Sequence, residues 1–317
     1  MCLIRAENLA KYYIEKSAPF LGEEKIIHAL DAVSFSIEEG QTLGLVGESG
    51  CGKSTLARII VRLENATKGK IYYKNRDITN WRGEKLKQLR KKIQIIFQNS
   101  RSSLDPRQTV GEIIMEPLKN YKINPDKQMA KVKEMVNIVG LNPQLLSRYP
   151  HEFSDGQCQR VNIARALILE PELLVCDEPI SSLDVSLQAQ ILNLLNELKK
   201  IFNLSYLFIS HDLHAVKYIS DKMAVMYLGE IVEVFNIKYL NKRHHHPYTE
   251  ILLKAIPIID PLQKNQWYSI SCNLDNEIIE KGCKFLPRCP YSKKICHLKK
   301  PTLKSIENEH FLACHLY

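Results

Sequence analysis

Residues 47–54 read Gly47-Glu48-Ser49-Gly50-Cys51-Gly52-Lys53-Ser54, which matches the pattern G-x-x-x-x-G-K-[ST] at every position. This pattern describes a turn between a strand and a helix whose backbone N–H groups converge on the phosphates of a nucleotide. The flanks fit, because the apolar run Thr42–Val46 precedes the turn and Thr55–Ile60 continues as a helix. The motif predicts a nucleotide site formed by Gly47, Ser49, Gly50, Cys51, Gly52, Lys53, Ser54 and Thr55.

Two side chains of this loop have specific tasks. The Lys53 ammonium can reach the β- and γ-phosphates, and the Ser54 hydroxyl can bind Mg²⁺. A second motif lies at residues 171–179, where an apolar run ends in the adjacent carboxylates Asp177 and Glu178. At the end of a buried parallel strand, Asp177 would bind Mg²⁺ and Glu178 would polarise the attacking water as general base. A solvated acidic turn is the alternative, and the phosphate loop upstream counts against it.

Further motifs follow in the order typical of one family. With them, the chain resembles the ATP-binding-cassette (ABC) ATPases over most of its length. In that family two cassettes dimerise head to tail, and the signature of one caps the ATP held by the other. Phe153–Arg160 is similar to this signature. The resemblance therefore implies that Ser154, Gly156 and Gln157 contact ATP in a partner cassette. The other matches are Gln98 of the lid loop, Ser182–Asp184 of the dimer interface, the switch histidine His211, and Tyr13, on which adenine stacks.

The resemblance also implies a mechanism with ATP and Mg²⁺ as cofactors. Glu178 is the implied catalytic base, with Gln98 and His211 as the other catalytic residues. Ser54, Gln98 and Asp177 are the implied Mg²⁺ ligands. Closure of the dimer would move coupled membrane subunits between inward- and outward-facing states, and hydrolysis would reopen it. The loops at residues 98–110 are the expected docking surface for the membrane subunit.

One signature residue, Asp155, departs from the family, which usually has two consecutive glycines here. A carboxylate near a γ-phosphate adds like-charge repulsion, which a low dielectric strengthens. If the side chain points into solvent instead, the cost is small. Our hypothesis is that the composite site containing this signature hydrolyses ATP more slowly than its twin.

The expected fold class is α/β, a RecA-like P-loop ABC nucleotide-binding domain with an antiparallel β arm and a helical subdomain, plus a short Cys-rich C-terminal extension. We expect the ABC ATPase domain at residues 1–240, with its helical subdomain at about 100–165. The oligopeptide/dipeptide-transporter-type C-terminal region, which contains the cysteine cluster, is expected at residues 241–317. Residues 166–230 should return to strand–helix alternation, as a parallel core does.

The arm is predicted from alternating apolar and polar residues at 1–45 and at about 66–97. Lys16–Gly22 is predicted to be a loop. A chain of 317 residues with 45% hydrophobic composition can bury one large domain plus an appendage. We expect no secretory leader, and no apolar run approaches the ~20 residues of a membrane helix. A transporter cassette of this kind would therefore borrow its membrane domain.

The net charge of +9 is concentrated in the tail, where residues 281–317 contain eight Lys or Arg and two Glu. A basic surface can bind phosphates without specificity. The rest of the chain is only mildly basic, so we expect no specific nucleic-acid partner. A tail that lies against a membrane partner or anionic headgroups explains the charge at least as well.

The C-terminus suggests a subfamily. His246–Thr249, followed by Ala255–Pro257, resembles the extension of dipeptide and oligopeptide importer ATPases, and so does Gly282–Pro290. Residues 207–213 and 225–229 are more similar to the F-type subunit than to its D-type sister. The resemblance implies import of di- or oligopeptides by a heterodimer with a D-type ATPase on two transmembrane permeases, served by an extracytoplasmic solute-binding protein. The chain would be peripheral, at the cytoplasmic face of the membrane.

Other functions stay open. Similar ATPases energise import of nickel chelates or glutathione-like solutes. A soluble mechanical or regulatory ABC ATPase usually has two cassettes or a long coiled-coil insertion, and neither is visible here. A module that holds ATP without turnover is disfavoured by Glu178 and His211 and slightly favoured by Asp155.

Four of the nine cysteines, Cys283, Cys289, Cys296 and Cys314, lie close together in the sequence. An ATP-using chain without a leader sits in a reducing compartment, so structural disulfides are not expected. Four thiolates can form a tetrahedral zinc site or hold an iron–sulfur cluster. The family resemblance implies a [4Fe–4S] cluster that clamps the tail, with zinc or no metal as alternatives. Successive side chains of His244–His246 diverge, so we interpret this triplet as a loop.

Overall fold

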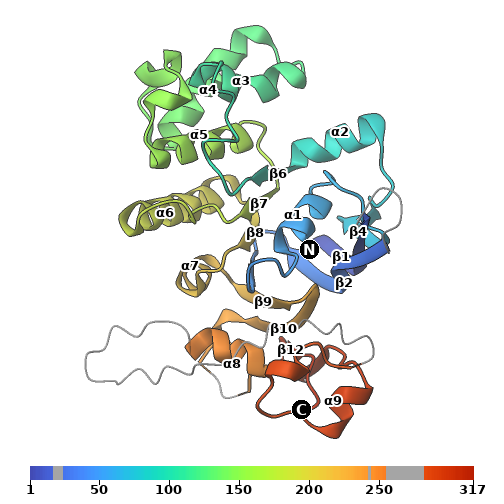
Figure 1. Ribbon diagram of the computed structural model, residues 1–317. Coiled ribbons are helices and arrows are strands. Elements are labelled where there is room, and N and C mark those ends of the chain that lie inside the picture. The colour runs from blue at the N-terminus through green and yellow to red at the C-terminus, as the bar shows by residue number, and fades with distance from the viewer. Residues whose placement is uncertain (17–23, 242–243, 255–281) are drawn as a thin grey trace, which may run out of the picture.

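The computed structural model describes residues 1–16, 24–241, 244–254 and 282–317. Apart from Lys16, the predicted loop Lys16–Gly22 lies outside the described residues, as does Ala255–Pro257. Figure 1 shows three parts around a central sheet: an arm of strands near the N-terminus, a group of helices at one end, and the C-terminal region at the other. None of the described helices is both long enough and apolar enough to cross a membrane.

The central sheet has the strand order β11-β12-β10-β9-β3-β8-β7-β6. Strands β9, β3, β8, β7 and β6 pair in parallel, whereas β10, β12 and β11 pair antiparallel at one side. The parallel strands are apolar because both of their faces are covered. The bounds are β3 Thr42–Val46, β6 Ile93–Ile96, β7 Leu173–Asp177, β8 Ser205–Ile209, β9 Lys222–Tyr227, β10 Glu230–Asn236, β11 Lys304–Glu307 and β12 His310–Leu312.

The second sheet is the antiparallel arm, with the strand order β2-β1-β4-β5. Its strands are β1 Cys2–Lys16, β2 Glu24–Glu38, β4 Lys68–Tyr73 and β5 Arg76–Asp77. The prediction of an arm over 66–97 was wrong for its last part. Residues 83–92 form helix α2, and 93–96 form β6, a parallel edge strand of the central sheet. Leu86 and Leu89 have helical spacing and pack beneath an otherwise charged α2.

Helices α3, α4 and α5 fall within or next to residues 100–165, the range predicted for a helical subdomain. Figure 1 shows α3, α4 and α5 together, away from the arm. The alternation expected for 166–230 is also present, as β7, α6, β8, α7 and β9. The helix bounds are α1 Lys53–Ile60, α2 Gly83–Lys92, α3 Val110–Asn120, α4 Pro125–Ile138, α5 Asp155–Leu167, α6 Val185–Phe202, α7 Leu213–Ile219, α8 Pro247–Lys254 and α9 Lys294–Leu298.

The core has two halves, one on each face of the central sheet. In β7, Leu173 and Val175 join the cluster beneath the arm, whereas Leu174 and Cys176 join the cluster beneath the helices. This alternation follows from the two-residue repeat of a strand. Each fully buried leucine contributes about 2 kcal/mol of hydrophobic free energy. The sheet is thereby fixed, and its strand ends can present side chains precisely placed for chemistry.

Candidate functional site

The phosphate loop lies where the sequence predicts it, between the end of β3 and the start of α1. Two glycines are required by packing. A Cβ on Gly47 would lie 2.2 Å from the Met226 carbonyl oxygen, and one on Gly52 would lie 2.3 Å from that of Ala29. Gly52 also has a φ of +106°, which glycine adopts at no steric cost. The loop can therefore pack against neighbouring backbone only with glycine at these positions.

The first two residues of α1 hold the loop and the acidic strand end. Lys53 Nζ donates hydrogen bonds to the carbonyl oxygens of Gly47 and Glu48, at 2.8 and 2.9 Å. Ser54 Oγ donates to Asp177 Oδ1 at 3.1 Å. The hydroxyl and the carboxylate are hard oxygen ligands of the kind that Mg²⁺ prefers. The two motifs found in the sequence thus meet at one point.

The acidic pair occupies the end of β7. Burial raises the pKa of Asp177; the hydrogen bond from Ser54 opposes that effect, and the charge of Glu178 adds to it. Glu178 has a φ of +50°, and its backbone N–H donates to the Ile209 carbonyl oxygen at 3.0 Å. A left-handed conformation costs a non-glycine residue about 1–3 kcal/mol and is typical of functional sites. The turn separates the directions of the two carboxylates.

Glu178 has two polar neighbours. Gln98 Nε2 donates to Glu178 Oε2 at 2.8 Å, and His211 Nδ1 lies 3.5 Å from the same oxygen. Gln98 follows β6, Glu178 follows β7, and His211 follows β8. Because these parallel strands end at one edge, the three side chains predicted to be catalytic come together there.

These residues surround a cavity of about 840 Å³, a size typical of small-molecule sites. Gly47, Cys51 and Asp177 lie behind its lining and contact it through Lys53 and Ser54. Most of the predicted ATP-site residues of this chain line the cavity directly: Ser49, Gly50, Gly52, Lys53, Ser54, Thr55, Gln98, Glu178 and His211.

Sequence reasoning missed the opposite wall of the cavity. Lys284 belongs to it although it comes from the C-terminal region, and its Nζ donates to the Leu228 carbonyl oxygen at 3.0 Å. Lys284 also pairs with Asp31 and Glu230, at 3.0 and 2.7 Å. Lys284 lies in the stretch Gly282–Pro290, whose sequence indicates a subfamily resemblance but does not place it at the ATP site. The wall consists of Ile26, Ile27, His28, Ala29, Leu228, Gly229 and Lys284.

Tyr13 lies outside the described lining. Its hydroxyl donates to Glu64 Oε2 at 2.6 Å, and Lys11 Nζ lies 5.0 Å from the centre of its ring. The residue is 37% exposed. Stacking of adenine on Tyr13 stays a prediction.

The signature residues begin helix α5. Ser154 Oγ accepts a hydrogen bond from the Gln157 backbone N–H at 3.3 Å, and Gln157 Oε1 accepts one from the Ser154 N–H at 3.0 Å. This capping box fixes the helix start. A Cβ on Gly156 would lie 3.0 Å from Leu187, so the helix packs closely on α6. Ser154, Gly156 and Gln157 lie outside the described lining of the cavity.

Asp155 has a partner in the lid loop. Its Oδ1 lies 2.7 Å from Arg101 Nε, and Arg101 also donates to the Phe153 carbonyl oxygen at 2.9 Å. Both side chains are about half exposed. The guanidinium group offsets the carboxylate charge, which reduces the repulsion expected from Asp155.

The four tail cysteines are free thiols that interact electrostatically with one another. The pKa of Cys283 is raised to about 11, mainly by burial and also by the charges of Cys296, Cys314 and Cys289. The Cys283 N–H donates to the Cys296 carbonyl oxygen at 2.8 Å. Within the described residues, no three of these sulfur atoms lie within 4.8 Å of one another. In a tetrahedral zinc site with Zn–S bonds of about 2.3 Å, they would be ~3.8 Å apart.

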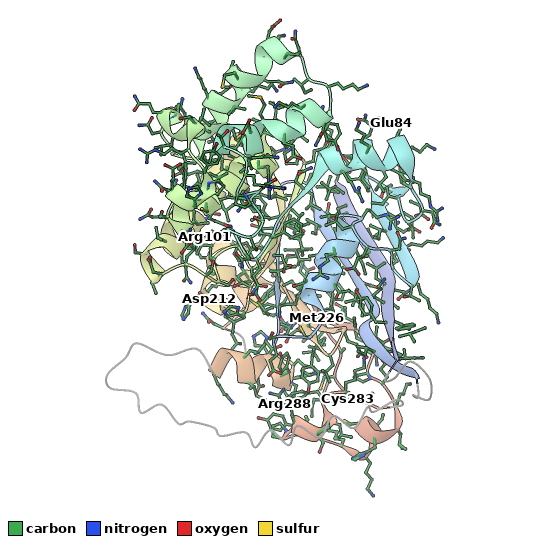
Figure 2. All side chains as sticks on the ribbon, turned by 45° about the horizontal axis from the view of Figure 1, so that its top comes forward. Glu84, Arg101, Asp212, Met226, Cys283 and Arg288 are labelled. Carbon is green, nitrogen blue, oxygen red and sulfur yellow. The ribbon has the colours of Figure 1, made fainter. Side chains whose placement is uncertain are left out.

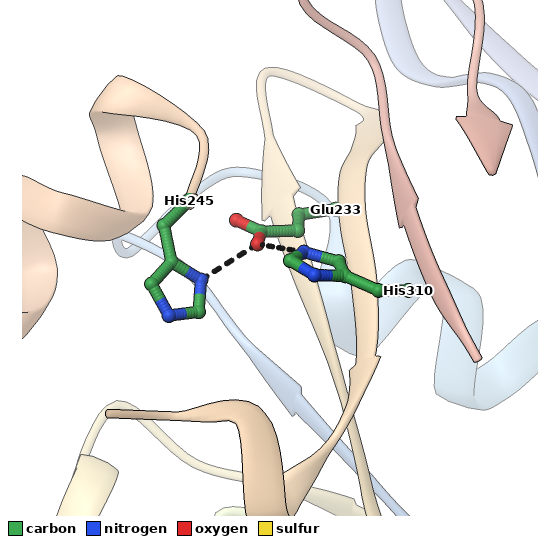
Figure 3. Close-up of side chains that lie close together, drawn as sticks. All are labelled: Glu233, His245 and His310. Carbon is green, nitrogen blue, oxygen red and sulfur yellow. Dashed lines mark hydrogen bonds and ion pairs between the residues drawn. The ribbon is translucent and has the colours of Figure 1, made fainter. Parts of the chain in front are cut away.

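A different polar group fastens the C-terminal region to the sheet (Figure 3). Glu233 Oε1 lies 2.7 Å from His245 Nδ1 and 2.7 Å from His310 Nε2, and all three residues are buried. We call Glu233, His245 and His310 the sheet anchor. His245 Nε2 lies 3.1 Å from the Leu240 carbonyl oxygen, so both of its ring nitrogens face acceptors. His245 is therefore an imidazolium that pairs with Glu233.

The pKa values agree with this charge state. Burial acts to lower the pKa of His245, but its hydrogen bond and ion pair with Glu233 raise it overall. Burial acts to raise the pKa of Glu233, but the hydrogen bonds from His245 and His310 lower it overall. The ligand atoms already bond to one another at hydrogen-bond distance. We interpret the group as a polar anchor rather than a metal site.

Solved structures share this architecture. The dimeric structure of MJ0796, a bacterial ABC transporter cassette, has a TM-score of 0.65 and 28% identity, over 74% of this chain and 99% of that chain. The structure of cbiO1 from Clostridium perfringens, part of the ABC transporter complex cbiONQ, has a TM-score of 0.65 and 26% identity. This match covers 80% of this chain and 93% of cbiO1. The fold and the cavity together define a cassette of the ABC ATPase class.

Curated relatives narrow this class. The "ABC transporter" family matches residues 30–181, and the family "Oligopeptide/dipeptide transporter, C-terminal region" matches residues 232–296. Oligopeptide transport ATP-binding protein AppF of Bacillus subtilis is 45% identical over 99% of this chain and 97% of its own length. The oligopeptide transport protein OppF of Salmonella typhimurium is 46% identical, over 92% of this chain and 88% of its own length. The dipeptide transport protein DppF of Haemophilus influenzae is 43% identical, over 98% of this chain and 96% of its own length. The chain belongs to the family of ATP-binding subunits of oligopeptide/dipeptide ABC transporters.

Proposed function

We propose that this chain hydrolyses ATP to energise import of di- or oligopeptides, as one half of a head-to-tail pair of ATPase subunits. Relatives named as oligopeptide or dipeptide transport ATP-binding proteins, at 43–46% identity, support the solute class. The observation that carries hydrolysis is the Glu178 carboxylate, which accepts a hydrogen bond from Gln98 and lines the same cavity as Lys53 and Ser54.

In this mechanism the cassette's own residues divide the work. Lys53 and the loop N–H groups bind the phosphates, while His211 contacts the γ-phosphate and Glu178 takes a proton from the attacking water. Ser54, Asp177 and Gln98 would hold Mg²⁺, which neutralises phosphate charge when bound. Adenine stacks on Tyr13. The partner cassette's nucleotide is capped by Ser154, Gly156 and Gln157.

Replacement of the base tests hydrolysis. Glu178→Gln should lower the ATPase rate at least about 100-fold while ATP binding remains, because the amide cannot accept the proton. The control is Glu170→Gln, which removes an exposed carboxylate paired with Lys131 and should leave the rate unchanged. Near wild-type turnover by Glu178→Gln would remove Glu178 from the mechanism.

We further propose that the chain works at the cytoplasmic face of the membrane, with a D-type sister ATPase and two permeases that are served by a solute-binding protein. A second cavity of about 640 Å³ supports docking at residues 98–110. It is lined by residues of the lid loop, α3 and α5, among them Phe97, Asn99, Ser102, Ser103, Glu116 and Arg165. MJ0796 was solved as a dimer after hydrolysis, bound to ADP and phosphate, which supports the pairing of cassettes.

Purification from detergent-solubilised membranes tests these partners. Recovery of two multi-spanning proteins and a sister ATPase is the expected result, and the associated solute-binding protein would identify the solute. A partner that binds nickel chelates or glutathione-like compounds would replace the peptide assignment. Ribosomal or DNA-bound partners alone would overturn the transport role.

We also propose that Cys283, Cys289, Cys296 and Cys314 hold a [4Fe–4S] cluster that clamps the tail. The charges of Cys296, Cys314 and Cys289 all act on Cys283, which supports the four thiols belonging to one site. Anaerobic purification followed by iron, sulfide and zinc analysis tests this. Four irons per chain are expected, and loss of iron on Cys296→Ser. One zinc and no iron would establish the alternative, and a metal-free tail would exclude both.

A further inference from the structure

We propose that the C-terminal region is a working part of the ATP site, because Arg288 and Tyr248 hold Glu48 and thereby set the conformation of the phosphate loop. Both are positioning residues for ATP binding. The inference rests on the proposed ATP site in this cavity. In this inference, Tyr248 and Arg288 hold the phosphate loop in the conformation that binds ATP, although they lie 200 and 240 positions after Glu48.

The contacts reach one residue of the loop from two elements. Arg288 Nη1 and Nη2 donate to the two carboxylate oxygens of Glu48, each at 2.8 Å. The Glu48 backbone N–H donates to Tyr248 Oη at 2.9 Å. The Glu48 carbonyl oxygen accepts from Lys53 Nζ, which is the ligand predicted for the phosphates. We call Glu48, Arg288 and Tyr248 the loop anchor.

The Arg288 side chain is oriented by aromatic residues that surround its guanidinium group. Its Cζ lies 5.8 Å from the ring centre of Tyr227, 6.0 Å from that of Tyr248 and 5.9 Å from that of Phe285. Only 18% of the side chain is exposed, and Tyr248 is fully buried. Figure 2 shows Arg288 in the C-terminal region near Cys283, below Met226 of β9. Aromatic packing aims the planar guanidinium group, and two parallel bonds fix the angle of the carboxylate.

Support at Glu48 complements the tight packing of Gly47 and Gly52, because the loop is open at Gly50 between them. Gly50 has a φ of +79° and nothing within 4 Å of a Cβ position, so packing does not fix it. Ser49 and Gly50, which follow Glu48, line the cavity. A ligand binds more tightly to a loop already held in its bound form. Arg288 also offsets a carboxylate that would otherwise repel the phosphates.

The test measures affinity of the full-length chain for the fluorescent probe mant-ATP with Mg²⁺. Arg288→Met should raise the Kd about tenfold, the effect expected for loss of a charged, bidentate bond. Arg288→Lys should bind more tightly than Arg288→Met but less tightly than the wild type, because lysine keeps the positive charge but cannot form the two parallel hydrogen bonds. In ATPase assays the KM should rise by more than the kcat falls.

The matched control is Lys300→Met. Lys300 Nζ lies 2.9 Å from Asp31 and 2.8 Å from Glu230, so it fastens the same region without touching the phosphate loop. Its Kd should equal that of the wild type. Metal content is measured for every variant, so that a change at the neighbouring cysteines is detected.

The outcomes separate the two proposals. If the wild type does not bind mant-ATP, the proposed ATP site fails. If the wild type binds and Arg288→Met binds equally well, only the loop anchor fails. An equal loss in Arg288→Met and Lys300→Met would mean that general detachment of the tail causes the effect, and this too would overturn the positioning role.

Discussion

Two of the contacts that hold the C-terminal region against the cassette differ in burial. In the sheet anchor, Glu233 and His310 are completely buried. In the loop anchor, the Glu48 side chain is 45% exposed. A buried charge that loses its partner is costly, whereas water screens an exposed one. The sheet anchor should therefore govern stability, and the loop anchor should govern the shape of the ATP site.

The largest loss of stability is expected for Glu233→Gln, in the sheet anchor. The substitution leaves the buried His245 imidazolium without a counter-charge, so the free energy of unfolding should fall by about 3–5 kcal/mol. Urea unfolding measures the loss. Glu250→Gln is the control, because Glu250 forms an i,i+4 pair with Lys254 at 3.9 Å and should change stability by at most about 0.5 kcal/mol. Equal effects of the two substitutions would refute the ranking by burial.

Acid should weaken the same region through His246. Burial lowers the pKa of His246 to about 4, against about 6.5 in an unfolded chain. A depressed histidine pKa means that stability is full above pH 6.5 and is lost as the pH falls from 6.5 towards 4. The loss amounts to roughly 3 kcal/mol at most.

His246→Asn tests this pH dependence, because the new side chain does not titrate and can still accept from the Tyr248 N–H. Urea unfolding at pH 7, 6 and 5 should give a shallower decline for the variant than for the wild type. Identical slopes would mean that other groups cause the acid sensitivity.

The loop anchor should give a smaller stability change. Arg288→Met removes a pair with one exposed partner, so the free energy of unfolding should fall by about 1 kcal/mol or less. A fall as large as that of Glu233→Gln would show that the loop anchor is structural. Thermal unfolding beside the mant-ATP titration compares both effects on one sample.

The smallest effect is expected for Arg101, whose pair with Asp155 is exposed on both sides. Arg101→Gln should change stability by less than about 0.5 kcal/mol. Without the guanidinium group, however, the Asp155 charge is no longer offset near the partner's nucleotide. ATPase assays with one glutamate base of the ATPase pair disabled at a time should then show slower turnover at the composite site containing Asp155. Equal turnover at both sites would refute the hypothesis of a slower site.

Local motifs were predictable from sequence because their residues are neighbours or end adjacent strands. The phosphate loop between β3 and α1 and the Asp177–Glu178 pair at the end of β7 are such cases. The contacts of Lys284 and Arg288 were not predictable, because their partners in the cavity wall and the loop lie 56 and 240 residues away. The triplet at 244–246 was interpreted as a loop, yet His245 and His246 are buried by contacts with β10 that periodicity does not report.

The pairing of β12 with β10 has a further consequence. Glu233, Val234 and Phe235 lie opposite Leu312, Phe311 and His310, and β11 continues the sheet beyond them. A chain that ended before residue 282 would leave β10 as an edge strand whose N–H and C=O groups could pair with another molecule. The C-terminal region therefore also covers a strand edge, and we expect a shortened chain to aggregate more readily than the full-length chain.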